Sequence, residues 1–390
     1  MEGDFIRINK WLLPLSWLYG LAVRVRNALF DLGVLKSESF DVPVISVGNI
    51  TVGGTGKTPH VEYLIDLLRH KCRVAVLSRG YKRKTRGYVV ADSTATARTI
   101  GDEPYQMKHK FPDVTVAVDR DRRHGIRRLT EDKSADGIDV VLLDDAFQHR
   151  YVKPGINILL VDYHRLIIYD KLLPAGRLRE QLSGKNRADI VIITKCPADL
   201  KPMEFRVITK AMDLYPYQHL YFTRLDYGDL HPLAGGRPLG IETLRKQKHI
   251  VLLTGIASPK QMMLDLAPLC PDIRPLTFAD HHNFTAEDAN RINRTFEATP
   301  APRLIVTTEK DAARLAGLKE LTDEVRKAIY VLPVHIRFML EQEDNFNENI
   351  IGYVRKNSRN SILAKAKDDN KPKDSDNTGH RTGTISFRNN

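Results

Sequence analysis

A glycine-rich segment ending in a lysine and a threonine is the first feature of the chain that could do chemistry. It reads SVGNITVGGTGKTP over residues 46–59. In a phosphate-binding loop, glycines let backbone N–H groups curl around phosphate oxygens, the lysine reaches the β and γ phosphates, and the hydroxyl group binds magnesium. The strict pattern places a glycine where Thr51 stands, so neighbouring glycines would supply the flexibility. The predicted nucleotide-binding residues are Thr51, Val52, Gly53, Gly54, Thr55, Gly56, Lys57 and Thr58.

Two aspartates follow a fully apolar run and could bind a metal ion. The sequence VVLLDDAFQHR brings Asp144 and Asp145 to the carboxyl end of a predicted strand, the usual place for a site in an open α/β sheet. Carboxylates there hold magnesium or its water shell and neutralise charge on a transferring phosphoryl group. The alternative is a solvated turn, which the wholly apolar strand disfavours. A further pair in GDEP, Asp102 and Glu103, could furnish a metal ligand or a catalytic base.

Phosphoryl transfer to an alcohol also needs a group that accepts the hydroxyl proton, such as a carboxylate or a histidine. The sequence FADHHNF offers Asp280, His281 and His282 between a predicted strand and a predicted helix. A pair of histidines is more often surface decoration than catalytic, so the pattern alone leaves both interpretations open.

Basic residues gather in three segments that could clamp phosphates or meet an anionic membrane. Most should be solvated helix faces, and we select Arg177 as the exception. The segments are SRGYKRKTR (Arg79, Lys82, Arg83), DRDRRHGIRR (Arg120, Arg122, Arg123) and AGRLRE (Arg177, Arg179).

The segment ITKCPAD is similar to the guanine-reading sequence Asn-Lys-x-Asp of GTPases. Thr194 stands in place of the asparagine and Pro197 in place of the aspartate. Because the acid that pairs with guanine is missing, the sequence favours ATP over GTP.

The elements that must position these groups read as a parallel α/β fold. Helical periodicity follows the glycine-rich loop directly, so a chance GKT in an ordinary turn is the weaker alternative. Residues 215–240 favour an antiparallel linker, and a second α/β unit begins near Ile250, with helices from Pro259 and Thr285. Strands are predicted at 42–47, 73–78, 114–118, 138–143, 156–161, 189–194, 251–255, 274–278 and 304–308.

The two ends of the chain differ from this pattern. From Trp11 to Val23 run 13 residues without a charge, followed by Arg24 and Arg26. That is short of the roughly 20 apolar residues of a membrane span, so we expect either an interfacial helix or an ordinary buried one. From Arg355 onward, nine Lys or Arg stand against four Asp with few apolar residues, which predicts a disordered basic tail.

Composition sets broad limits on function. The 390 residues suffice for two domains, and the net charge of +12 points to anionic partners, although the tail carries +5 of it. Three cysteines without a CxxC pair indicate neither a disulfide framework nor a zinc site and favour a reducing cytoplasm.

Read together, eight ordered motifs resemble the tetraacyldisaccharide 4'-kinase family, the lipid A 4'-kinases of Gram-negative bacteria. The resemblance covers roughly residues 11–334. The motifs are GNITVGGTGKTP, SRGYKR, GDEP, LLDDAFQHR, LLPAGRLRE, TGIASPKQ, FADHHNF and TTEKDAAR.

The resemblance implies an ATP-dependent enzyme that phosphorylates the 4'-hydroxyl of tetraacyldisaccharide 1-phosphate, giving lipid IVA at the cytoplasmic face of the inner membrane. It implies ATP and Mg²⁺ as cofactors, the lipid and the membrane surface as partners, and no nucleic acid or obligate protein partner. The family also has a threonine at the position of Thr51. The implied roles are catalysis for Lys57 and for a dyad of Asp102 and His281, metal binding for Thr58, Glu103, Asp144 and Asp145, and substrate or phosphate contact for Tyr81 and Arg177.

We therefore expect a P-loop NTPase-like, mostly parallel sheet flanked by helices. The predicted division is an N-terminal membrane-associated helix (1–35), the kinase core (36–214), an antiparallel linker (215–248), a smaller α/β domain (249–354) and the tail (355–390). A P-loop nucleotidase acting as a metal or assembly chaperone is the rival function, but it should show a Cys or His cluster, and none is visible. A basic membrane- or nucleic-acid-binding protein without catalysis would leave Lys57, Thr58 and Asp144 without a purpose.

Overall fold

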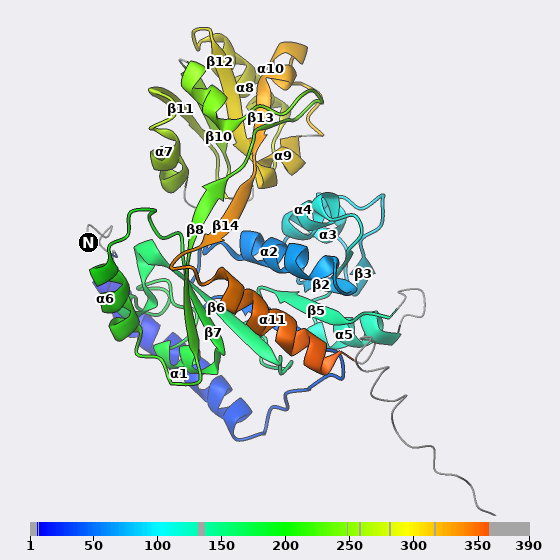
Figure 1. Cartoon of the computed structure of the whole chain (residues 1–390), viewed down its shortest axis with the longest axis vertical. Coiled ribbons are helices and arrows are strands. Elements are labelled where there is room, and N and C mark those ends of the chain that lie inside the picture. The colour runs from blue at the N-terminus through cyan, green and yellow to red at the C-terminus, as the bar shows by residue number, and fades with distance from the viewer. Residues whose placement is uncertain are drawn as a thin grey trace, which may run out of the picture.

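The computed structural model describes residues 6, 8–131, 137–247, 249–256, 259–280, 282–315 and 317–358. Figure 1 shows two sheets, each flanked by helices, stacked along the long axis of the molecule. The larger sheet has nine strands in the order β14-β8-β7-β6-β1-β5-β2-β4-β3, and the smaller has five in the order β11-β10-β12-β13-β9. The predicted fold class, a mostly parallel α/β sheet with a smaller α/β unit, is confirmed.

The central strands of the larger sheet are continuous apolar runs because both faces are covered. Its inner strands pair in parallel, and only β3 and β14 at its two edges run antiparallel. All six strands predicted for this unit are present. The strands are β1 (Val44–Gly48), β2 (Val74–Ser78), β3 (Val89–Val90), β4 (Thr115–Val118), β5 (Val140–Asp144), β6 (Ile156–Asp162), β7 (Ile190–Thr194), β8 (His219–Tyr227) and β14 (Val334–Phe338).

Helices cover each face of this sheet. On one face lie α2 (Lys57–Arg69), α4 (Asp102–Lys110) and α11 (Glu343–Asn357), packed on a single apolar cluster. On the other face α5 (Arg122–Glu131) and α6 (Pro202–Met212) pack on separate clusters. The short helix α3 (Ala97–Ile100) leads into α4.

The smaller sheet contains every strand predicted for it. Its helix α8 begins after Thr285, whose side chain caps the N-terminus by accepting a hydrogen bond from the backbone N–H of Asp288 (3.3 Å). The elements are β9 (His231–Pro232), β10 (His249–Thr254), α7 (Lys260–Leu266), β11 (Asp272–Thr277), α8 (Ala286–Glu297), β12 (Arg303–Thr308), α9 (Glu309–Leu315), α10 (Asp323–Ala328) and β13 (Ile329–Leu332).

The chain crosses between the two sheets on a pair of strands, and here the structure differs from the prediction. β8 lies within the segment predicted as a linker, but it adds to the larger sheet in parallel with β7. β14 and α11, placed by the sequence with the smaller unit, pair with β8 and pack on the larger core. Contacts between aromatic rings stabilise the packing of β14 and α11 on the larger unit. The rings are those of Tyr63, Tyr221, Phe338 and Phe346. The pairing of β8 with β14 joins segments that are far apart in the chain, so no local pattern in the sequence predicts it.

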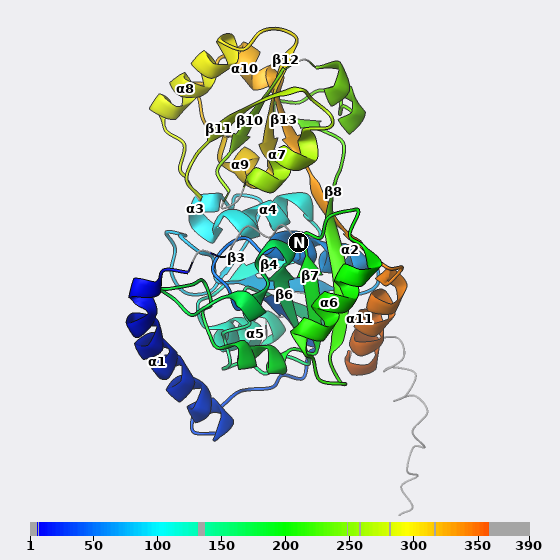
Figure 2. The same cartoon turned by 90° about the vertical axis from the view of Figure 1, so that its left-hand side faces the viewer.

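The N-terminal helix α1 (Leu13–Asp31) runs along the edge of the larger unit, as Figure 2 shows. Ser16, Gly20 and Phe30 face the protein, whereas Trp11 and Trp17 are 92% and 71% exposed. Within the described ranges, no helix combines the length and the hydropathy needed to cross a bilayer.

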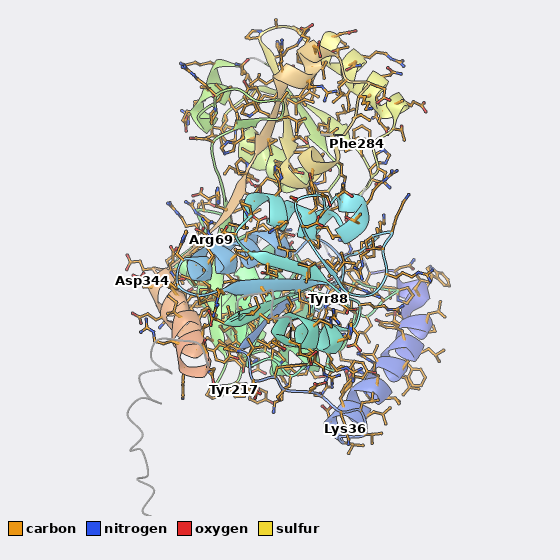
Figure 3. All side chains as sticks on the ribbon, turned by 90° about the vertical axis from the view of Figure 1, so that its right-hand side faces the viewer. Lys36, Arg69, Tyr88, Tyr217, Phe284 and Asp344 are labelled. Atoms are coloured by element: carbon orange, nitrogen blue, oxygen red, sulfur yellow. The ribbon has the colours of Figure 1, made fainter. Side chains whose placement is uncertain are left out.

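The C-terminal end of the fold lies slightly beyond its predicted position. Helix α11 continues to Asn357, past the predicted start of the tail at Arg355. Residues 359–390 of that tail lie outside the described residues. Figure 3 draws the side chains on the ribbon and labels Phe284 in the smaller unit and Lys36 beyond the end of α1.

Candidate active site

The glycine-rich loop has the strand–loop–helix context that the sequence predicts. It leaves β1 at Gly48 and enters α2 at Lys57, with Gly53 and Gly56 at φ values of 123° and 80° that favour glycine. The approach at Gly48 is also tight, because a Cβ there would lie 2.7 Å from the Cβ of Phe147. The loop can therefore expose its N–H groups to an anion.

Thr51 shows why this loop dispenses with its first glycine. The residue forms an isolated β-bridge with Leu178, and the backbone N–H of Val52 donates to the carbonyl of Arg177 (2.8 Å). An extended, buried backbone suits a β-branched residue and needs no positive φ. The guanidinium of Arg177 also lies beside the loop, since its Nη1 would be 3.9 Å from a Cβ on Gly53.

A cleft of about 230 Å³ opens above the loop, between the two sheets. The larger unit contributes residues 54–59 and Glu103, and the smaller unit contributes Asp280, Thr308 and Lys310. A nucleotide held by the loop would therefore contact both units.

Asp144 ends β5 and Asp145 follows it, and the two carboxyl groups lie in opposite electrostatic environments. Asp144 is fully buried; its Oδ2 accepts a hydrogen bond from Ser78 Oγ (3.0 Å), while its Oδ1 has no partner within the described part of the chain. Burial, with the nearby charges of Glu103 and Asp145, raises the pKa of Asp144 to about 7.

Asp145, at φ 46°, is instead surrounded by cations. Its Oδ1 lies 3.6 Å from Lys57 Nζ and 3.4 Å from Arg179 Nη1. Burial alone would raise the pKa of this carboxyl, but Lys57 and Arg179 outweigh it and hold the pKa below its usual value. The predicted lysine and acidic pair are thus brought together, and Arg179 joins them.

These oxygens fit a magnesium ion. The orphaned, buried Oδ1 of Asp144 lacks a positive partner, and Thr58 and Glu103 line the adjoining cleft. Among the residues that the structure describes, no three His, Cys, Asp or Glu side chains form a metal cage by themselves. That arrangement suits Mg²⁺, which binds through one or two carboxylates together with substrate phosphates and water.

The predicted base Asp102 is the first residue of α4, and a residue from the smaller unit holds its carboxylate. Arg314 of α9 donates to Asp102 Oδ2 from Nη2 (2.5 Å) and Nε (3.1 Å). The same arginine contacts Asp311 (3.2 Å). Sequence reasoning missed Arg314, although it belongs to the quoted motif TTEKDAAR.

The second half of the predicted dyad, His281, lies outside the described residues. Its neighbour Asp280 lines the cleft and lies 3.4 Å from Lys310 Nζ, which is also 3.7 Å from Glu103. His282 points elsewhere, since its Nε2 is 2.8 Å from Asp288 Oδ2 and its ring stacks on Phe278. His282 thus has a structural role, and the pairing of Asp102 with His281 stays a prediction.

Tyr81, the predicted substrate contact, is 56% exposed. Its backbone carbonyl would lie 3.1 Å from a Cβ on Gly101, the residue before Asp102. The exposed ring therefore stands next to the start of α4.

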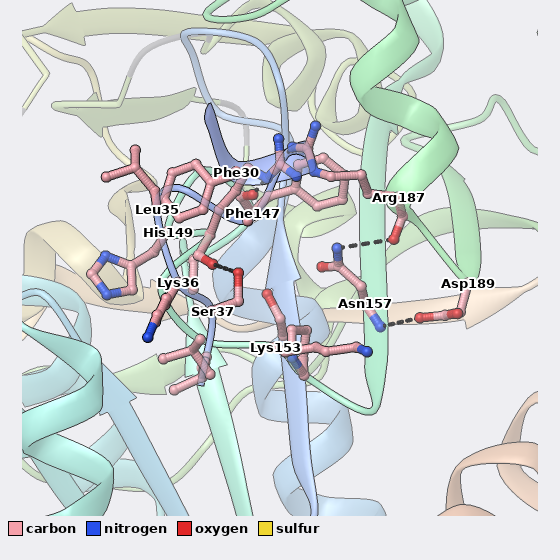
Figure 4. Close-up of a pocket in the computed structure, with 17 residues that line it drawn as sticks. Phe30, Leu35, Lys36, Ser37, Phe147, His149, Lys153, Asn157, Arg187 and Asp189 are labelled. Atoms are coloured by element: carbon pink, nitrogen blue, oxygen red, sulfur yellow. Dashed lines mark hydrogen bonds between the residues drawn. The ribbon is translucent and has the colours of Figure 1, made fainter. Parts of the chain in front are cut away.

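A second cavity, of about 690 Å³, lies behind the segment that follows Asp145 (Figure 4). Phe30, Leu35 and Phe147 line it, and its arginines Arg150 and Arg187 are paired with Asp31 and Glu180. None of the predicted site residues lines this cavity.

A parallel sheet with a phosphate-binding loop after β1 and an acidic pair at the end of the adjacent β5 defines a P-loop nucleotide-binding protein. Comparison with known proteins narrows this class. The family model for LpxK, tetraacyldisaccharide-1-P 4'-kinase, matches residues 8–355. The chain therefore belongs to this family, as its motifs indicate.

Individual relatives agree with the family match. The chain is 58% identical to the tetraacyldisaccharide 4'-kinase of Phocaeicola vulgatus, over 93% of this chain and 99% of that protein. It is 54% identical to the one of Bacteroides thetaiotaomicron, over 93% and 98%. The crystal structure of LpxK from Aquifex aeolicus in complex with ATP superposes with a TM-score of 0.66 at 30% identity, covering 88% of this chain and 98% of that one.

Proposed function

We propose that this protein transfers the γ-phosphate of ATP to the 4'-hydroxyl of tetraacyldisaccharide 1-phosphate and so forms lipid IVA. The family match over residues 8–355 supports this acceptor. The observation that carries the chemistry is the convergence of Lys57, Asp145 and Arg179 beside the loop that opens into the cleft. Transfer of a phosphoryl group depends mainly on positioning and on charge stabilisation, which such a site supplies.

The phosphate end of ATP is held by the loop. Backbone N–H groups of residues 54–58 bind phosphate oxygens, and Lys57 neutralises charge on the β and γ phosphates. Thr58 and the carboxylates of Glu103, Asp144 and Asp145 would hold magnesium, which would neutralise charge on the phosphates. Lys57 Nζ lies 3.6 Å from Asp145 Oδ1, so the phosphates of ATP would share the ammonium group with this carboxylate.

Asp102, together with His281, accepts the proton of the attacking sugar hydroxyl. The position of Asp102 at the cleft end of α4 supports this role, since its neighbour Glu103 lines the cleft. Arg314 fixes the orientation of this carboxylate through its ion pair with Asp102 Oδ2. Tyr81 and Arg177 contact the substrate or its phosphates.

The lipid acceptor is reached from the membrane surface. Trp17 and Leu18 on the outer side of α1, and Trp11 just before it, are exposed and would enter the headgroup zone, with Arg24 near anionic lipid. Arg26, in contrast, donates a hydrogen bond to the backbone carbonyl of Gln148 (3.0 Å) and so helps attach α1 to the larger unit. We place the protein peripherally at the cytoplasmic face of the inner membrane.

The test is direct. Purified protein is incubated with γ-labelled ATP, magnesium and the acylated disaccharide 1-phosphate, and the lipid product is separated and analysed. Label at the 4' position is the expected result, and the Lys57→Ala variant serves as the inactive control. Absence of labelled lipid, with a proven kinase of the family active in parallel, would refute the function.

A further inference from the structure

Side chains from outside the phosphate-binding loop form hydrogen bonds with the backbone carbonyls on its outward side. Three successive backbone carbonyls each meet a different partner. They are Gly54 O with Lys195 Nζ, Thr55 O with Thr194 Oγ1 (3.0 Å) and Gly56 O with His60 Nδ1 (2.7 Å). We call Thr194, Lys195 and His60 the carbonyl clamp.

Holding a carbonyl also orients the next N–H. Because a peptide unit is planar and trans, its C=O and N–H point in opposite directions. Fixing the carbonyls of residues 54–56 outward therefore turns the N–H groups of residues 55–57 inward. Within the described part of the chain, none of these three N–H groups donates a hydrogen bond. They are the donors that a P-loop offers to phosphate.

Thr194 is the member of the clamp that cannot touch the nucleotide. It ends β7 and has no solvent exposure. Its single hydroxyl hydrogen is shared between Thr55 O (3.0 Å) and Val161 O (3.3 Å). Any effect of this hydroxyl on nucleotide binding must therefore pass through the loop backbone.

Lys195 follows in a left-handed backbone conformation, with φ 57°, which is uncommon outside glycine. This turn directs the side chain back to the loop, where Nζ bonds Gly54 O and Asp162 Oδ2 (2.7 Å). The carboxylate of Asp162, at the end of β6, thus helps hold the ammonium group against the loop.

His60 completes the clamp from inside α2. Burial lowers the pKa of its imidazole to about 4, so the ring is neutral near pH 7. A carbonyl can only accept, so Nδ1 carries the hydrogen donated to Gly56 O. Nε2 then accepts from the hydroxyl of Thr223 (3.0 Å), a fully buried residue of β8.

We propose that Thr194, Lys195 and His60 are positioning residues that preorganise the loop N–H groups for the phosphates of the nucleotide. Residues 193–195 (ITK) are similar to a guanine-reading motif, but here they position the loop and do not read the base. This inference rests on the proposed use of ATP at the loop. It predicts that the clamp affects recognition of phosphate groups and leaves recognition of the nucleoside unchanged.

The experiment compares Thr194→Val with Thr194→Ser in the full-length protein. Equilibrium titration with ADP and, separately, with adenosine gives two dissociation constants, and thermal unfolding without ligand monitors the fold. We expect Thr194→Val to weaken ADP binding about three- to tenfold, as for loss of one hydrogen bond at a buried acceptor. Adenosine binding should change less than about twofold, and Thr194→Ser should restore ADP binding.

The matched control is Thr307→Val in β12. This threonine is equally buried, and its hydroxyl has no hydrogen-bond partner in the described structure. It should leave both dissociation constants unchanged. If Thr194→Val proves too unstable, Lys195→Met compared with Lys195→Arg tests the bond to Gly54 O, at a side chain that also lines the cleft.

Two results would overturn the proposal. One is an ADP dissociation constant within twofold of the wild type in both Thr194→Val and Lys195→Met. The other is an equal loss of ADP and adenosine affinity together with a lower melting temperature, which indicates a purely structural role. ADP binding needs no lipid, so a failure of lipid phosphorylation would refute the proposed acceptor and leave this test intact.

Discussion

Asp144 and Asp145 are adjacent in sequence but have opposite pKa shifts, and this difference has a consequence for stability. Burial and the neighbouring carboxylates raise the pKa of Asp144 from 3.8 to about 7. Between these two pH values the folded state binds more protons than the unfolded state, so stability falls as pH rises. The cost of this buried charge is complete above about pH 7 in the nucleotide-free protein.

Asp144→Asn should therefore stabilise the nucleotide-free protein at pH 8 while abolishing turnover. We expect a gain on the order of 1–2 kcal/mol, or a few degrees in melting temperature, that nearly vanishes at pH 4. Thermal unfolding at pH 4, 6 and 8 measures it. Ser78→Ala is a useful comparison, because it removes the hydrogen bond to Asp144 and keeps the charge. A gain that is independent of pH would contradict the assigned environment.

Asp102 provides the second residue-scale prediction. Asp102→Asn keeps the shape of the side chain but removes its basicity, so kcat should fall about 10²-fold or more while the KM for ATP changes little. Steady-state kinetics with the lipid acceptor checks this. Asp66→Asn, at an exposed pair with Arg69, is the matched control. Near-normal turnover in Asp102→Asn would show that Asp102 is not the base.

At the scale of elements, α4 is clamped to the smaller unit at both of its ends. Asp102 at the start of α4 meets Arg314 of α9, and Lys110 at its end lies 2.8 Å from both Glu62 of α2 and Glu309 of α9. Burial, partly offset by Lys110, raises the pKa of Glu62 to about 7. The ammonium group of Lys110 thus offsets the repulsion between the carboxylates of Glu62 and Glu309.

Lys110→Met should destabilise the protein by about 2–4 kcal/mol at pH 8, because it leaves a buried carboxylate unpaired beside another. The loss should shrink at pH 5, where Glu62 can take up a proton. Denaturant unfolding at both pH values gives the comparison. Arg69→Met, which breaks surface pairs with Asp66 and Asp113, should cost less than about 1 kcal/mol. Equal losses in both variants would argue against the inter-unit role.

At the scale of the whole molecule, α1 places an apolar surface beside the active-site strands. The hydroxyl of Tyr19 donates to the backbone carbonyl of Arg179 (2.6 Å), and Arg179 contacts Asp145. Helix α1 is therefore linked through Arg179 to Asp145, one of the predicted metal ligands.

The double variant Trp17→Ser, Leu18→Ser should lower binding to vesicles containing anionic lipid about tenfold or more, since two large side chains leave the headgroup zone. Vesicle sedimentation measures this, and ADP affinity should stay unchanged. Met203→Ser is the control, because that side chain is 65% exposed and belongs to α6, which Figure 2 shows apart from α1. Unchanged vesicle binding in the double variant would remove α1 from the membrane-binding surface.

The sequence by itself determined the nucleotide loop, the acidic pair and the parallel strands, because each rests on short-range spacing. It determined the family through eight motifs that occur in a fixed order along the chain. Lys57, Thr58 and Asp145 could be named since a strand–loop–helix unit carries its own geometry. Tertiary structure alone decided that β14 and α11 return to the larger sheet, that Arg314 holds Asp102, and that Arg179 joins Arg177 at the loop. It also decided that Thr194, Lys195 and His60 form hydrogen bonds with the loop carbonyls. These contacts join residues more than a hundred positions apart in most cases, and no local pattern encodes such pairing.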